Sequence, residues 1–298
     1  MRTAAALLPA LALTGALGDC VIAAPVHVSE PRVVTAPATV DGVPAGMQYL
    51  YGSGEAAAGS RQVWQALVGY VRAQQQVQFR QAGGRTGVVL EPGSTLAAPR
   101  LQRCGAKPPA AVFDVDETVA LNLGFERDAA SGRPYEAARW RAYELTGGTT
   151  ARAVPGAVEA VRQLRAMNVA VVFNSNRNAA NAAATAAMLE RLGLGPAVTG
   201  ETLFLADAET GSAKDGRRAA IAARYCVVAM AGDQLGDFSD LFNAGLTPAE
   251  RRAAADAPAI ARLWGAGWFV LPNPVYGTAL KGRLDEVFPA DSAWAPEP

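Results

Sequence analysis

Residues 111–118, Ala-Val-Phe-Asp-Val-Asp-Glu-Thr, join an apolar run to two carboxylates at the point where the run ends. The apolar part predicts a buried strand, and residues i and i+2 of an extended chain face the same way. Asp114 and Asp116 should therefore point together beyond the carboxyl end of the strand, where open α/β sheets bind ligands. Two carboxylates this close repel each other unless a cation or a shared proton relieves the repulsion.

This pair suits phosphoryl transfer at a hard metal ion, with Asp114 as the nucleophile and Asp116 as the proton donor. A strand that merely ends in a polar turn is the alternative for the motif taken alone, because short motifs also match by chance. Motifs in the rest of the sequence are needed to distinguish the two interpretations.

Strand and helix patterns alternate after this motif, which predicts an α/β fold with a doubly wound, mostly parallel sheet covered on both faces. An amphipathic helix over 56–81 should pack on the main body through Trp64, Leu67, Val68 and Val71. Residues 82–110 read as a connection. Further strands are expected at 169–173, 202–205, 226–231 and 268–271, and further helices at 157–167, 178–192, 214–224 and 248–264.

Polar residues that phosphoryl transfer requires follow three of these strands, and carboxyl ends of parallel strands share one edge. A hydroxyl such as that of Ser175 can hold phosphate oxygens, and Lys214 can act as a cation beside the transferring group. Each residue alone has an ordinary explanation, such as a helix cap, a turn or a surface lysine. Their common placement favours one site, to which we assign Thr118, Ser175, Asn176 and Arg177 for phosphate, Lys214 for catalysis, and Asp233 and Asp237 for metal.

Composition excludes several other functions. The 27 basic and 27 acidic residues cancel, so no global field recruits a nucleic-acid polymer or an anionic membrane. The single histidine, His27, leaves no basis for a histidine nucleophile, a serine-histidine hydrolase or a histidine-rich zinc site.

The N-terminal residues indicate export. Residues 1–24 have the charged start and short apolar stretch of an export signal, and 25–48 read as an extended leader. We expect a periplasmic or secreted protein; membrane attachment through a lipidated Cys20 stays open as the alternative. An oxidising compartment would also permit a bridge between Cys104 and Cys226, with two buried thiols as the other reading.

The motifs together resemble the haloacid dehalogenase-like superfamily, and within it the class C bacterial acid phosphatases, which include lipoprotein 5′-nucleotidases. The matching segments are 113–119 with Asn122 and Phe125, 152–156, 176–177, Lys214, 232–238 and 270–277. The resemblance implies Mg²⁺ held by Asp114, the Asp116 carbonyl and Asp233, with Asp237 in support. It also implies aromatic side chains that stack on a base, for which Phe125, Trp140 and Tyr276 are the candidates, with Tyr143 nearby.

We therefore expect residues 49–298 to form a phosphatase domain, with its core at about 108–121 and 151–284 and a mainly helical second region from about 49–81 and 122–150. The expected function is that of an exported, Mg²⁺-dependent acid phosphatase that hydrolyses phosphomonoesters, 5′-nucleotides among them, through an aspartyl phosphate. A phosphotransferase that uses an alcohol acceptor and a non-catalytic nucleotide-binding surface protein remain as alternatives. A homodimer is compatible with the sequence.

Overall fold

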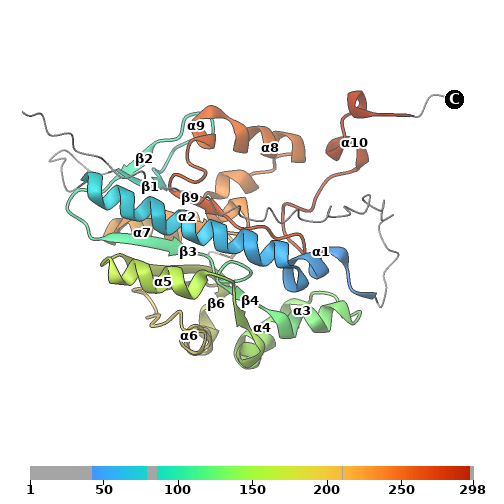
Figure 1. The fold of residues 1–298 in the computed structure, drawn as a ribbon, viewed down its shortest axis with the longest axis horizontal. Coiled ribbons are helices and arrows are strands. Elements are labelled where there is room, and N and C mark those ends of the chain that lie inside the picture. Colours follow the sequence, from blue (N-terminus) through green and yellow to red (C-terminus); the bar gives the residue numbers. More distant parts are fainter. Residues whose placement is uncertain (1–41, 79–85, 210, 296–298) are drawn as a thin grey trace, which may run out of the picture. The chain divides into compact units, whose positions relative to one another are not determined.

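Five parallel strands form the central sheet, in the order β7-β6-β3-β8-β9. Figure 1 shows the whole fold, with β3, β6 and β9 of this sheet labelled. The computed structural model describes residues 42–78, 86–209 and 211–295. The sheet confirms the predicted α/β class and parallel pairing. Its strands are β3 (Pro109–Phe113), β6 (Ala170–Asn178), β7 (Leu203–Ala206), β8 (Cys226–Gly232) and β9 (Trp268–Val270).

Side chains alternate along β3, so apolar residues point to both faces of the sheet, and helices cover both faces. Ala111 and Phe113 join the core beneath α2 (Gly54–Gln78), α5 (Ala157–Ala166) and α6 (Ala182–Arg191). Ala110 and Val112 join the opposite core, with α7 (Asp215–Arg224), α8 (Pro248–Asp256) and α9 (Pro258–Ala261). Each fully buried large side chain contributes about 1.5–3 kcal/mol, so the two cores hold the strand ends in fixed positions.

Helix α2 belongs to this layered core. We expected 49–81 to join the 122–150 insertion in a second helical region, but Trp64 and Leu67 of α2 are buried against the sheet beside α5. The second region consists instead of α3 (Leu123–Ala130), α4 (Ala137–Thr146) and the 3₁₀ turn η3 (Gly147–Thr150). At its base β4 (Ala120–Leu121) pairs with β5 (Arg152–Ala153) in antiparallel fashion.

Two segments differ from the sequence prediction near the N-terminus. The expected connection 82–110 contains an antiparallel hairpin of β1 (Thr86–Leu90) and β2 (Leu101–Arg103), whose Val88 carbonyl accepts a 2.8 Å hydrogen bond from Trp268 Nε1. The end of the expected extended leader is helical, in α1 (Ala45–Met47) and the π-helical turn η2 (Gln48–Gly52). Residues 1–41, with the predicted export signal, His27 and Cys20, lie outside the described residues.

Smaller differences concern helix and strand ends. The expected helix over 248–264 breaks between α8 and α9 at Pro258, because proline lacks the N–H that a continuing helix needs. Strand β6 runs on to Asn178, and η4 (Ala179–Asn181) precedes α6. The remaining short turns are η5 (Leu235–Asp237), η6 (Asp240–Asn243), α10 (Leu284–Val287) and η7 (Ala290–Ser292). None of the helices within the described ranges is long and apolar enough to cross a bilayer.

A disulfide joins Cys104 to Cys226, with their Cα atoms 4.7 Å apart. Of the two readings that the sequence left open, the structure shows the bridge. It links the segment after β2 to the first residue of β8, across 122 positions of the sequence. The hairpin is thereby fastened to the strand that carries Asp233 at its far end.

Candidate active site

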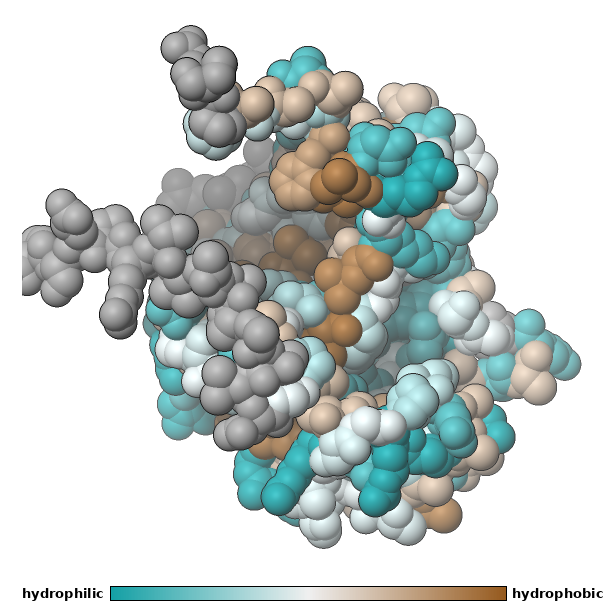
Figure 2. All heavy atoms as spheres, turned by 90° about the vertical axis from the view of Figure 1, so that its right-hand side faces the viewer, coloured by the Kyte–Doolittle hydropathy of each residue, from teal (hydrophilic) through white to brown (hydrophobic). Residues whose placement is uncertain are grey.

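A cavity of about 760 Å³ opens at the carboxyl end of the sheet. It is lined by residues that follow β3 and β8, by residues at the carboxyl ends of β6 and β7, by the loop before α7, and by the helical insertion. Figure 2 shows the side of the protein on which α1, α3 and α10 lie, where hydrophobic side chains gather along a hollowed part of the face. The topology thus brings the predicted strand-end residues to one place.

Asp114 is the first residue beyond β3. Its backbone N–H donates to the Ala231 carbonyl at 3.0 Å, which continues the pairing of β3 with β8 and fixes where the side chain leaves the sheet. The carboxylate contacts Lys214 Nζ and lies 3.5 Å from the Thr118 hydroxyl. Burial raises the pKa of Asp114 well above its usual range; Lys214 opposes this rise, and the nearby carboxylates of Asp237 and Asp233 add to it.

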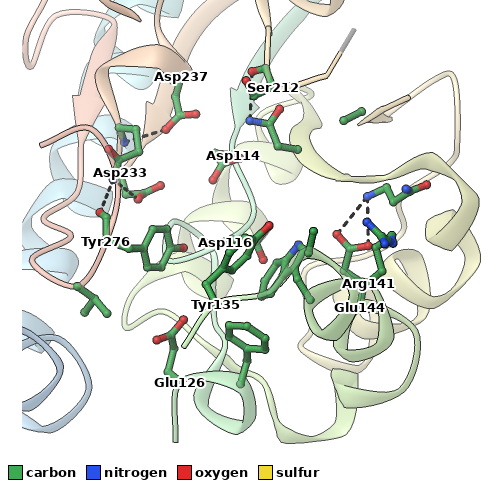
Figure 3. Close-up of a pocket in the computed structure, with 18 of the residues that line it drawn as sticks. Asp114, Asp116, Glu126, Tyr135, Arg141, Glu144, Ser212, Asp233, Asp237 and Tyr276 are labelled. Carbon is green, nitrogen blue, oxygen red and sulfur yellow. Dashed lines mark hydrogen bonds between the residues drawn. The ribbon is translucent and has the colours of Figure 1, made fainter. Parts of the chain in front are cut away.

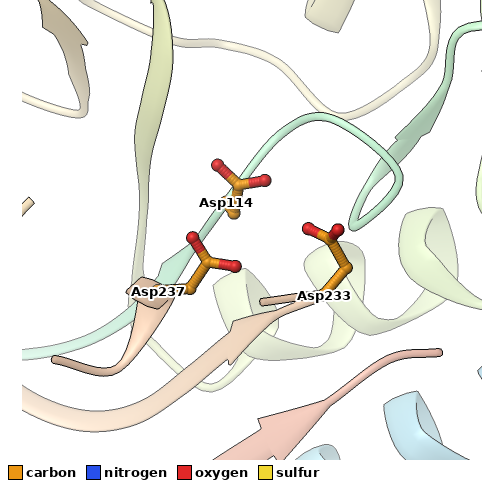
Figure 4. Close-up of side chains that lie close together, drawn as sticks. All are labelled: Asp114, Asp233 and Asp237. Atoms are coloured by element: carbon orange, nitrogen blue, oxygen red, sulfur yellow. The ribbon is translucent and has the colours of Figure 1, made fainter. Parts of the chain in front are cut away.

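Asp114, Asp233 and Asp237 form a cluster of carboxylates turned toward one shared space (Figure 4). One oxygen from each lies within 4.8 Å of the others. Asp233 accepts hydrogen bonds from Asn273 at 2.8 Å and Thr118 at 3.1 Å, yet burial and Asp237 raise its pKa to about 7. Lys214 offsets only part of the charge, so the cluster fits a divalent cation that prefers oxygen ligands.

Lys214 is fixed by contacts to its ammonium group and to its backbone N–H. Its ammonium contacts Asp114 and lies 2.6 Å from Asp237 Oδ1, and these two carboxylates raise the pKa of Lys214 to about 12 although burial lowers it. Its backbone N–H donates to both carboxylate oxygens of Asp240 at 2.9 Å. Lys214 is therefore a fixed positive charge in the wall of the cavity.

Asp116 points into the same cavity, and Arg177 holds it there. The guanidinium places Nε 2.9 Å from Asp116 Oδ1, and its Nη2 donates to Asn122 Oδ1 at 2.8 Å. Asn122 Nδ2 also donates to Asp116 Oδ1 at 2.9 Å. Ser175 Oγ lies 3.4 Å from Asp116 Oδ2. These contacts fix the orientation of the Asp116 carboxylate in the cavity lining.

The four residues assigned to phosphate binding occupy different places. Asn176 lines the cavity, where its side chain donates to the Ser212 carbonyl at 3.2 Å. Thr118 and Ser175 are fully buried beneath the carboxylates. Arg177 is 1% exposed, and its guanidinium lies 5.5 Å from the ring centroid of Trp140. The guanidinium donates its hydrogen bonds to Asp116 and Asn122.

The turn after β3 depends on Glu117, to which sequence analysis gave no role. Glu117 has a φ of 52°, a left-handed conformation that is strained for a residue with a side chain. Its buried carboxylate accepts hydrogen bonds from the backbone of Asn122 at 2.8 Å, from Tyr51 at 3.2 Å and from Tyr276. These bonds hold the turn, and only the folded chain brings Tyr51 and Tyr276 to it.

Aromatic residues form the outer wall of the cavity (Figure 3). Phe125 and Trp140 meet edge to face with ring centroids 4.9 Å apart, and Phe125 also contacts Tyr135 at 6.2 Å and Tyr143 at 5.5 Å. Tyr276 lines the cavity from the C-terminal side. The three stacking candidates therefore all reach the cavity, although Phe125 and Trp140 already pack on each other.

Comparison with known families agrees with this geometry. Residues 62–279 match the model described as HAD superfamily, subfamily IIIB (Acid phosphatase). The class C acid phosphatase from Bacillus anthracis is a structural neighbour with a TM-score of 0.62 and 23% identity, over 78% of this chain and 84% of that one. A tungstate-bound structure of the Bacillus anthracis class C enzyme matches with a TM-score of 0.62 and 21% identity, over 85% and 96%. A search of curated proteins found no match.

Proposed function

Because this chain belongs to the acid phosphatases of HAD subfamily IIIB, and so is a phosphomonoester hydrolase, we propose that it is an exported, Mg²⁺-dependent enzyme that accepts 5′-nucleotides. The observation that carries the proposal is the meeting of Asp114, Lys214 and the Asp233–Asp237 pair at one end of a cavity that continues along an aromatic wall. Export rests on the pattern of residues 1–24 alone.

The first half of the reaction uses two carboxylates. Asp114 attacks phosphorus, so that a bond from its oxygen to phosphorus forms while the bond from phosphorus to the leaving alcohol oxygen breaks. Asp116 gives its proton to that oxygen. Lys214 contacts the attacking carboxylate and supplies positive charge where the phosphoryl oxygens gather negative charge.

The second half hydrolyses the aspartyl phosphate. Asp116, now ionised, takes a proton from a water molecule, whose oxygen bonds to phosphorus as the bond to Asp114 breaks. Arg177 and Asn122 keep Asp116 in place through both halves, because they bond to its Oδ1 and leave Oδ2 to exchange the proton. Ser175 touches that second oxygen at 3.4 Å.

The carboxylates of Asp114, Asp233 and Asp237, with the Asp116 carbonyl, are the groups that would hold Mg²⁺. A divalent ion there would draw charge from the phosphoryl oxygens and relieve the repulsion among the carboxylates. The tungstate found in the Bacillus anthracis enzyme is an oxyanion like phosphate, which supports an oxyanion site in this fold.

A nucleoside is the leaving group that we favour. The cavity volume lies within the usual range for sites that enclose small molecules. Stacking a base on an aromatic ring contributes about 1–3 kcal/mol, and Trp140 and Tyr276 both line the space beyond the carboxylates.

The test is phosphate release from 5′-AMP and from a small aryl phosphate, with and without Mg²⁺, by the mature protein and by Asp114→Asn. We expect metal-dependent release that Asp114→Asn abolishes, with the nucleotide favoured in kcat/KM. No release from either ester by a folded, metal-loaded sample, from acidic to neutral pH, would contradict the proposal. Added alcohol acceptors would reveal a phosphotransferase through formation of a new phosphoester.

A further inference from the structure

Glu126 is a buried carboxylate in the active-site cavity that nothing in the mechanism above uses. It lies in α3, next to Phe125, and is 6% exposed. It lines the cavity, and Figure 3 shows its carboxylate pointing toward the side chains of Tyr276 and Asp116. Within the described parts of the chain, its carboxylate receives no hydrogen bond and has no ion-pair partner.

A carboxylate in this position is costly for the protein. Buried charges are normally paired or hydrogen-bonded, since desolvation is otherwise uncompensated. Burial, with a smaller contribution from Asp116, raises the pKa of Glu126 to about 7. The neighbouring Glu117 shows the ordinary arrangement, because its carboxylate receives bonds from Asn122, Tyr51 and Tyr276. The described residues give Glu126 no hydrogen-bond donor, and its place in the cavity lining lets water or a bound molecule supply one.

The location of Glu126 indicates which part of a substrate would supply that donor. In the proposed mechanism Asp116 protonates the leaving oxygen, so groups close to Asp116 on the open side of the cavity face the leaving alcohol. Glu126 is close enough to Asp116 to feel its charge. Lys214 and the carboxylate cluster occupy the opposite, phosphate end.

We propose that Glu126 is the acceptor site for an O–H or N–H donor carried by the leaving group, so that the enzyme selects esters of hydroxylated or amino alcohols over plain alkyl esters. This inference rests on the proposed function and adds a substrate class to it. Ribose hydroxyls and ammonium groups share the required chemistry. A site built to accept a hydrogen bond discriminates strongly against an analogue that lacks the donor, because its polar group is then left unpaired.

The test compares n-propyl phosphate, 3-hydroxypropyl phosphate and 3-aminopropyl phosphate, which differ in the group at one end. We expect kcat/KM to be about tenfold or more higher for the two esters that carry a donor. The comparison is made at about pH 8, where Glu126 is ionised. Glu126→Leu removes the acceptor and should abolish this ratio, and Glu126→Gln, which keeps an acceptor oxygen without charge, should lower it most for the amine. Glu136→Gln is the matched control, because Glu136 is exposed and has no capping bond.

Equal kcat/KM for all three esters, or a ratio that persists in folded Glu126→Leu, would overturn the inference while leaving the phosphatase proposal intact. If Glu126→Leu does not fold, the ratio of the amine to the propyl ester in Glu126→Gln decides, because that ratio should fall when the charge is removed and its persistence would overturn the inference. If none of the esters were hydrolysed, that result would contradict the proposed function instead. Calorimetric binding of the three esters to Asp114→Asn would then give the same comparison without turnover, and equal affinities would overturn the inference.

Discussion

Asp240 accepts the backbone N–H of Lys214 at 2.9 Å, so a residue 26 positions further along the chain fixes the position of the Lys214 backbone. Its Oδ2 also accepts the N–H of Asp215 at 2.7 Å. Arg218 completes the arrangement by donating to the carbonyls of Gly236 and Asp237 at 2.9 and 3.0 Å. The loop before α7 and the loop after β8 are thereby fastened to each other.

We expect Asp240→Ala to lower kcat about tenfold to hundredfold, with a smaller change in KM. The substitution frees the Lys214 backbone, and small displacements of catalytic groups are costly in rate. Steady-state kinetics at saturating Mg²⁺ measures the effect, with Asp256→Ala as an exposed control that removes the same charge. A kcat unchanged within about twofold would show that Lys214 is positioned by its side-chain contacts alone.

Arg177→Lys should lower kcat by about tenfold or more while leaving inhibition by inorganic phosphate unchanged. Lysine cannot bond to both Asp116 and Asn122 as the guanidinium fork does. Arg162→Lys, on the exposed side of α5, is the control. A weakened affinity for phosphate would favour instead the phosphate-binding role that the sequence suggested for Arg177.

The sequence placed Asp114, Asp116 and Asp233 at strand ends correctly because the signals for that placement are local. Asp114 and Asp116 are two residues apart at a strand end, and such spacing determines their common direction before any tertiary structure is known. Strand β8 likewise places Asp233 directly after a buried run. The parallel sheet then brings these ends together, as the alternation of strands and helices implied.

Residues that act through distant partners could not be found in this way. Asp240, Arg218 and Glu126 look like ordinary surface residues in the sequence, and only packing places them at the site. Arg177 was recognised, yet its ion pair with Asp116 spans 61 positions. The β1–β2 hairpin was missed because its glycines and prolines resemble a loop, while its contacts with β9 come from the other end of the chain.

Mg²⁺ should raise the thermal stability of the protein, independently of turnover. Lys214 forms ion pairs with Asp114 and Asp237 but not with Asp233, so part of the repulsion among the three carboxylates remains. An ion bound to the folded state alone stabilises it by about 2.7 kcal/mol at 100 times its Kd. Thermal unfolding with and without Mg²⁺ measures the shift. Asp233→Asn should reduce it and Asp256→Asn should not; an unshifted wild-type transition would argue against a metal at this cluster.

Loss of the Cys104–Cys226 bridge should lower stability by about 2–5 kcal/mol, because the bridge closes a long loop in the unfolded chain. Thermal unfolding of Cys104→Ala/Cys226→Ala measures this, and a reductant should destabilise the wild type while leaving the double variant unaffected. Thiol titration of the unfolded, unreduced wild type should detect neither cysteine. Two reactive thiols in addition to any thiol of Cys20 would mean that the bridge does not form.

Glu126 should make the protein less stable as pH rises. Its pKa is raised from 4.5 to about 7 by burial and by Asp116, and the nearby carboxyl of Glu117 and phenol of Tyr51 offer it no positive charge. Between these values the folded state holds a proton that the unfolded state has lost, so the stabilising contribution is complete below pH 4.5 and lost as pH rises through 7. Denaturant unfolding at about pH 5 and about pH 8 should therefore show the wild type losing on the order of 2 kcal/mol relative to Glu126→Gln, a value reduced for the solvent in the cavity. Glu136→Gln should follow the wild type, and an equal pH dependence in Glu126→Gln would show that the carboxylate finds a partner in solution.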